Sequence, residues 1–514
     1  MKPDSVQRSP GSVSNPDDFF ATDGVRKDLT GLTLRGAAAT IVSQAARFLI
    51  SIVGAIVLAR LLTPRDYGLI GMVGAVIGFI AIFRDLGLDS AVIQRADVTA
   101  SQVNALFWIN TATGVALAVA TAAIAPGVAW FYGEPSLTWI TIVSALAFVL
   151  GGSVVQHEAL LRRQMRFARL ATVDIGSMLV GFAAGILLAW RGAEYWALVL
   201  SQLVTAFARV CGLWACLDWR PRLAPKFAGI RPMLAFGANL TGFSFVNYFA
   251  RNLDNLLIGR YWGASQLGLY SRGYQLMTLP IDQINGPITT VAVPALSRLA
   301  DSPERYRKAY LRIIEKLAMV TIPLMVFLIM TSDWLVEVVL GPRWQGVSPI
   351  FALLGFAGIL QPIASTTGWL FVTQGRTSDM FRWGLIGCTL TVGSILVGLP
   401  WGALGVAASY SFTSLAVVIP LLFWFVGRSG PVRTRDIYRT IGPSIAMVPI
   451  VMLVLFVVRR SLADTDTLLS LSVALGATGC VALFVLYISP SGRAAIRDVI
   501  RSVAALRAAR TAPR

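Results

Sequence analysis

The chain has 514 residues, of which 56% are hydrophobic and only 14% are charged, and its mean hydropathy is +0.69. A water-soluble domain of this length would need roughly twice that density of charge. The net charge of +18 lies mostly in short segments between apolar runs, which is typical of membrane topology signals rather than of nucleic-acid binding. These values exclude a soluble globular protein, and we expect no nucleic-acid partner.

Apolar runs of about 20 residues recur along the chain, and each is long enough to cross a hydrocarbon core of about 30 Å. They predict an all-α membrane protein with about fourteen transmembrane helices, near residues 36–59, 67–84, 104–129, 137–157, 171–190, 194–217, 232–259, 264–297, 314–331, 347–373, 381–399, 401–427, 441–458 and 467–488. The eighth run is too long for a straight span, and its three prolines predict bends. Residues 1–30 are polar and predict a cytoplasmic tail.

Orientation follows from the placement of the basic residues. Of the 44 lysines and arginines, 33 lie in segments on the side of the amino end, 7 lie on the opposite side, and four lie within spans, namely Arg47, Arg209, Arg251 and Arg272. Positive charge collects in the cytoplasmic segments of membrane proteins. The tally therefore predicts that both termini are cytoplasmic, with short outer loops that leave no room for an external catalytic domain.

Two cytoplasmic segments have an amphipathic pattern. Residues 303–316 lead into the ninth predicted span, and residues 491–510 carry arginines opposite isoleucines and valines. Helices of this kind commonly lie on the membrane surface. We expect both segments to do so, with docking of a partner as the alternative.

The chain contains an internal repeat. The stretch LARLLTPRDYGLI (58–70) aligns with IGRYWGASQLGLY (258–270) at an offset of 200 residues, so that Gly68 falls on Gly268. Thr63 can cap the second span, with Pro64 at its first helical position and Asp66 hydrogen-bonding back. The repeat predicts two parallel six-helix bundles followed by two extra helices. The expected regions are a tail (1–30), two bundles (31–225 and 226–430), the two extra helices (431–490) and a basic amphipathic cytoplasmic tail (491–514).

The segments LARLLTPRDYGLIGM (58–72) and RDLGLDSAVIQR (84–95) resemble the start of bacterial polysaccharide flippases of the Wzx type. These belong to the multidrug/oligosaccharidyl-lipid/polysaccharide exporter superfamily, and the resemblance covers roughly residues 30–490. It implies a protein of the bacterial inner membrane that moves an undecaprenyl-pyrophosphate-linked glycan from the inner to the outer leaflet. The family implies alternating access between two bundles, driven by Na⁺ or H⁺. We expect no enzyme activity and no cofactor, and the oligomeric state stays open.

The candidate substrate-binding residues are polar side chains within predicted spans, namely Arg47, Arg251, Arg272, Asn247 and Gln275. Buried ions need partners or a watery cavity, and guanidinium groups match the geometry of a pyrophosphate. The alternative role is structural: Arg251 would pair with Asp254 three residues later, or Arg47 would extend to the interface.

Two carboxylates within spans, Asp254 and Asp282, are the candidates for ion coupling, because a carboxylate in a low dielectric can titrate or hold a cation. Either could instead be the counter-ion of an arginine. The four cysteines lack CxxC spacing and His157 is the single histidine, so no metal site is expected.

Three functions compete for this sequence. The first is the flippase, and the second is an exporter of drug-like or other small solutes, for which an acidic, aromatic cavity would be expected. The third is an enzyme, such as an integral-membrane polymerase or glycosyltransferase, and a polymerase would be expected to carry a sizeable outer loop. The arginines within spans favour the first function. An ATP-driven pump is disfavoured because the chain has no GxxxxGK[ST] loop.

Overall fold

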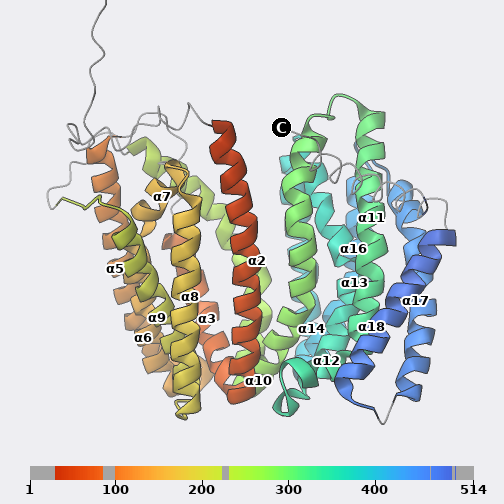
Figure 1. Cartoon of the computed structure of the whole chain (residues 1–514), viewed down its shortest axis with the longest axis horizontal. Coiled ribbons are helices and arrows are strands. Elements are labelled where there is room, and N and C mark those ends of the chain that lie inside the picture. The colour runs from red at the N-terminus through yellow and green to blue at the C-terminus, as the bar shows by residue number, and fades with distance from the viewer. Residues whose placement is uncertain (1–28, 85–98, 223–230, 463–464, 489–492, 494–514) are drawn as a thin grey trace, which may run out of the picture. The chain divides into compact units, whose positions relative to one another are not determined.

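The computed structural model describes residues 29–84, 99–222, 231–462, 465–488 and 493, with the backbone alone for 29–42, 231–247, 249–251 and 486. Helices account for nearly all of this part of the chain, and it contains no β-strand. The helices, several of which are labelled in Figure 1, are α2 (Leu29–Leu61), α3 (Pro64–Arg84), α5 (Ala100–Tyr132), α6 (Ser136–Gly152), α7 (Val155–Arg163), α8 (Phe167–Trp190), α9 (Tyr195–Cys216), α10 (Arg231–Ser297), α11 (Pro303–Met330), α12 (Ser332–Val339), α13 (Val347–Thr373), α14 (Thr377–Gly398), α15 (Gly402–Thr413), α16 (Ile419–Gly427), α17 (Thr434–Ser461) and α18 (Thr467–Ile488). The prediction of an all-α protein is confirmed.

Within the described residues, eleven helical stretches are long and apolar enough to cross a membrane. One of them, Thr377–Gly427, comprises α14, α15 and α16, and α14 packs against α15 after a turn at Gly402 with φ +71°. Helix α10 is not among the eleven and covers the predicted seventh and eighth spans. A multi-pass membrane protein is therefore confirmed, while the number fourteen stays a prediction.

Local sequence explains where two of the helices begin. The Asp66 carboxylate accepts a hydrogen bond from the Thr63 backbone N–H at 2.8 Å, and the Thr63 hydroxyl accepts one from the Asp66 N–H at 3.4 Å. This is the predicted cap of α3. Within α10 the helical path is broken at Gly263, whose φ of +78° suits glycine, and residue 264 starts the second arm as predicted.

The chain divides into two compact units. Unit 1 comprises residues 1–62 and 69–252, and unit 2 comprises residues 63–68 and 253–514, so the first turn of α3 belongs with unit 2. In unit 1, α8 packs against α9 and α2, and α5 packs against α6. Helices α5 and α6 approach closely at Gly114, where a side chain would place its Cβ 2.5 Å from the Phe148 carbonyl oxygen.

Unit 2 is centred on α11, which packs against α13 and α17. Buried side chains of α10, α11, α13, α16 and α17 form one apolar cluster. Helices α17 and α18 cover another part of α11, where Phe327 meets Val451 and Ala474. The two helices after the predicted repeats therefore pack onto the second unit.

The prediction that residues 303–316 lie on the membrane surface is wrong. This segment is the first part of α11, which runs without a break into the ninth span. The Tyr306 and Tyr310 side chains are fully buried, and their hydroxyls hydrogen-bond to Thr373 at 2.6 Å and Thr366 at 2.9 Å. The apolar face of the segment is covered by protein. The other amphipathic segment, 491–510, lies outside the described residues apart from Arg493.

Candidate functional site

A network of mostly half-buried charges connects four helices of unit 1. The guanidinium of Arg47 on α2 donates to Asp174 Oδ2 on α8 at 2.9 Å. The Arg209 Nε on α9 donates to Asp174 Oδ1, also at 2.9 Å. Each oxygen of Asp174 thus holds a different arginine, and this one carboxylate joins α2, α8 and α9.

Arg209 also reaches a second carboxylate. Its Nη2 donates to Glu158 Oε2 on α7 at 2.8 Å, and the other Glu158 oxygen accepts from Arg162 at 2.5 Å. The network therefore contains three arginines and two carboxylates, which leaves one surplus positive charge. We refer to these five residues (Arg47, Glu158, Arg162, Asp174 and Arg209) as the charge network.

Sequence reasoning identified Arg47 but not its partner. Asp174 follows Arg47 by 127 residues in the chain, so no local spacing connects them. The usable signal was Asp174 itself, an acidic residue inside the predicted span 171–190 with no basic residue in that span. Arg209, which lies in the predicted sixth span (194–217), is held by two carboxylates.

The other described arginine of the prediction, Arg272, lies on the second arm of α10 in unit 2. Its Cζ is 3.8 Å from the centre of the Tyr67 ring, and it donates a hydrogen bond to the Gln275 amide oxygen. Tyr67 is held from another side by the edge of Trp344, at 5.2 Å between ring centres. Among the described side chains, no carboxylate pairs with Arg272. Arg272 and Gln275 are thus in contact, and Tyr67 is a neighbour of Arg272 that sequence reasoning missed.

The two candidate coupling carboxylates differ in their surroundings. Asp254 is buried in unit 2, where it accepts hydrogen bonds from the Tyr270 hydroxyl at 2.9 Å and the Asn255 N–H at 2.8 Å. Asp282 is exposed on the same helix. The side chains of Asn247 and Arg251 lie outside the described residues, so the proposed Arg251–Asp254 pair is not addressed.

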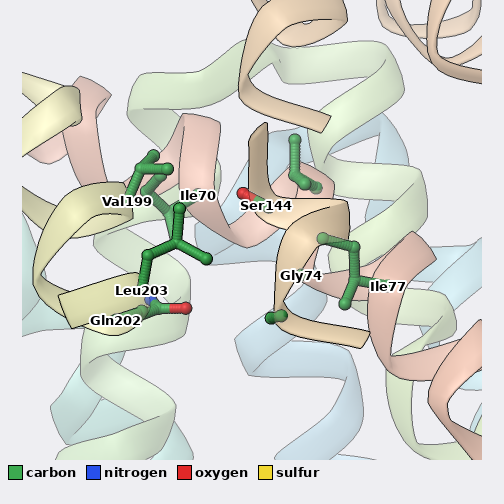
Figure 2. Close-up of a pocket in the computed structure, with 9 residues that line it drawn as sticks. Ile70, Gly74, Ile77, Ser144, Val199, Gln202 and Leu203 are labelled. Carbon is green, nitrogen blue, oxygen red and sulfur yellow. The ribbon is translucent and has the colours of Figure 1, made fainter. Parts of the chain in front are cut away.

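A cavity of about 80 Å³ lies in unit 1 between α3, α6 and α9 (Figure 2). Its wall is mainly apolar, with the Ser144 hydroxyl and the Gln202 amide as polar groups. A space of this size holds a few water molecules and is too small for a sugar. No group of three or more metal-ligating side chains occurs in the described part of the chain.

Comparison with known proteins gives a family match. A profile described as "Polysaccharide biosynthesis protein" matches residues 57–349, which include parts of both units. The chain is 29% identical to the teichuronic acid biosynthesis protein TuaB of Bacillus subtilis (strain 168), over 69% of this chain and 74% of that one. It is 26% identical to the lipopolysaccharide biosynthesis protein WzxC of Escherichia coli (strain K12), over 72% and 75% respectively.

Among solved structures, the fold is similar to that of a lipid II flippase, MurJ, in an inward closed conformation. The TM-score is 0.69 with 13% sequence identity, and the match covers 91% of this chain and all of that one. At this identity the likeness concerns the fold alone. It extends over nearly the whole chain and therefore includes the helices that follow the family match.

Proposed function

The chain belongs to the polysaccharide biosynthesis protein family, and on that premise we propose that it flips an undecaprenyl-pyrophosphate-linked oligosaccharide unit. Transport would run from the inner to the outer leaflet of the bacterial inner membrane, with both chain termini in the cytoplasm. The proposal is for a transporter and not an enzyme. It is supported by relatives named for the synthesis of teichuronic acid and lipopolysaccharide, and by a fold shared with a lipid flippase.

The observation that carries the proposal is the set of partners around Arg272. This guanidinium is held by an aromatic face and an amide oxygen, and no described carboxylate neutralises it. A cation inside the membrane is expensive unless an anion joins it. A pyrophosphate would supply that anion, and the flat faces of Tyr67 and the guanidinium would keep the donors aligned. We propose that Arg272 and Gln275 bind the pyrophosphate, together with Asn247 and Arg251 on the first arm of α10.

Arg47 requires a different account, because Asp174 already occupies one side of it. We keep Arg47 in the proposed binding set, on the condition that a phosphate replaces Asp174 as its partner. Transport would then proceed by alternating access between two six-span repeats, 31–225 and 226–430.

The coupling ion would act at Asp254. A buried carboxylate that accepts from a tyrosine hydroxyl and a backbone N–H can take up a proton or a sodium ion in exchange for those donors. Asp282 is the second candidate. Replacing Asp254 with Asn should abolish the response of transport to an imposed Na⁺ or H⁺ gradient.

The test is export of surface polysaccharide from cells that carry Arg272→Ala or Arg272→Lys. Both variants should reduce export at normal protein levels. Alanine has no charge, and lysine cannot form the bidentate hydrogen bonds that a guanidinium makes with a pyrophosphate. Arg382→Ala is the matched control, because the Arg382 side chain is 69% exposed and 4.0 Å from its carboxylate neighbour. Normal export from Arg272→Ala would refute the binding role.

Export of drug-like solutes is the alternative, and the same cells distinguish it. If the protein carries small cations, its deletion should sensitise cells to cationic dyes and leave the surface polymer intact. The opposite pattern, loss of one polymer with unchanged dye resistance, supports the flippase. The glycan that is lost would also identify the oligosaccharide.

A further inference from the structure

Within the charge network, Arg47 can leave with less disturbance than Arg209. Its described partner is Asp174 alone, and 34% of its side chain is exposed. Arg209 is held by two carboxylates on two different helices. If Arg47 departs, Asp174 keeps Arg209, so neither carboxylate is left without a cation.

Charge balance favours the same exchange. With Arg47 bound, the network carries one surplus positive charge. Without it, Arg162 and Arg209 balance Glu158 and Asp174. An anion that draws Arg47 away therefore leaves a neutral cluster behind, and an anion of higher charge than a carboxylate competes well for the guanidinium.

The network lies at a suitable depth for this anion. Asp174 is seven residues past the start of α8 at Phe167, and Arg209 is seven residues before the end of α9 at Cys216. At 1.5 Å per residue both are about 10 Å from helix ends that the charge tally assigns to the cytoplasm. The pyrophosphate of a lipid-linked substrate in the inner leaflet would enter from that side.

We infer that Asp174 is a positioning residue that competes with the substrate's pyrophosphate for Arg47. This inference rests on the proposed function. In the empty protein Asp174 holds Arg47 in place. The entering pyrophosphate takes over the guanidinium, and Asp174 recaptures it when the lipid leaves. The competition weakens binding and thereby permits release on the other side of the membrane.

The experiment measures binding and flipping separately, with the full chain in lipid nanodiscs and in proteoliposomes. The probe is undecaprenyl pyrophosphate without a glycan. Asp174→Asn keeps the size of the side chain and its contact with Arg209 while removing the charge that competes for Arg47. It should bind the probe about fivefold more tightly or better, and flip more slowly because release is delayed. Arg47→Ala should bind more weakly.

Two comparisons separate competition from general loosening of the network. Glu158→Gln alters the other partner of Arg209 without touching Arg47, and it should not tighten binding. In the Arg47→Ala background, adding Asp174→Asn should leave the affinity for the probe unchanged, because the guanidinium for which Asp174 and the pyrophosphate compete is absent. A structural role for Asp174 would instead reduce binding and flipping together in every background.

The outcomes are distinct. If the wild-type protein does not bind the probe, the proposed function fails and the inference falls with it. If the wild type binds and Asp174→Asn binds equally or less tightly, the inference alone is overturned. Should Asp174→Asn not fold, Asp174→Ser carries the same expectation, since a water can bridge to Arg209 in its place. If Glu158→Gln tightened binding of the probe as much as Asp174→Asn does, the inference would also be overturned.

Discussion

Gly68 lies against the backbone of Ala264 so closely that a Cβ on Gly68 would be 1.7 Å from the Ala264 carbonyl oxygen. The relationship is reciprocal, because a Cβ on Gly268 would be 1.8 Å from the Pro64 carbonyl oxygen. Pro64 and Ala264, like Gly68 and Gly268, are related by the same offset of 200 residues. Two helix starts that align with each other in the sequence thus cross at their glycines.

This crossing makes Gly68→Ala and Gly268→Ala strongly destabilising. The obstacle is backbone rather than a flexible side chain, so the helices must separate to admit a methyl group. We expect each variant to lose about 1–3 kcal/mol, visible as a lower temperature of unfolding in detergent. Gly127→Ala is the control, because no atom lies within 4 Å of the position its Cβ would take, and it should be neutral or slightly stabilising. Equal stability of all three would contradict the crossing.

Much of the helical architecture could be predicted from the sequence. The spans 347–373 and 467–488 coincide with α13 and α18, and the Thr63 cap and the Gly263 break lie where expected. These features depend on local patterns, namely apolar runs, capping residues and a glycine before a helix start. Predicting them requires no information about which part of the chain packs against each helix.

Features that depend on distant partners could not be predicted. The apolar side of residues 303–316 was visible, but an amphipathic pattern does not say whether lipid or protein covers it. Here Tyr306 and Tyr310 face protein. In the same way Arg47 was recognised as a costly ion, while its partner Asp174 is brought near only by the packing of α2 on α8.

Arg209 is predicted to be the stability-determining member of the charge network. Arg209→Met removes the cation that joins Asp174 to Glu158, and each carboxylate then keeps one arginine, Arg47 or Arg162. Because two ion pairs between partly buried groups are lost together, we expect a cost of about 1–3 kcal/mol. Arg162→Ala, whose side chain is 45% exposed, should cost less than about 1 kcal/mol.

Thermal unfolding of the two arginine variants in detergent, compared with the unsubstituted protein, checks this order. The double variant Arg209→Met with Glu158→Gln should lose less than the sum of the two single losses, because both substitutions break the same Arg209–Glu158 pair. A larger loss for Arg162→Ala than for Arg209→Met would contradict the assignment.

Tyr67 is predicted to control transport through Arg272. Its ring supports the guanidinium at 3.8 Å, a contact worth about 0.5–2 kcal/mol. Tyr67→Phe keeps the aromatic face and should leave polysaccharide export close to the level of the unsubstituted protein. Tyr67→Leu keeps an apolar side chain but removes the face, so Arg272 loses its alignment and export should fall several-fold.

Tyr67 also packs against Trp344, so its substitution could act through stability instead. Protein level and unfolding temperature must therefore be measured beside export for each variant. A loss of export by Tyr67→Leu at a normal protein level would indicate that the Tyr67 ring holds Arg272 in position for transport. Equal export by Tyr67→Leu and Tyr67→Phe would show that the aromatic face contributes nothing to transport, and Arg272 would then have to bind its ligand without this platform.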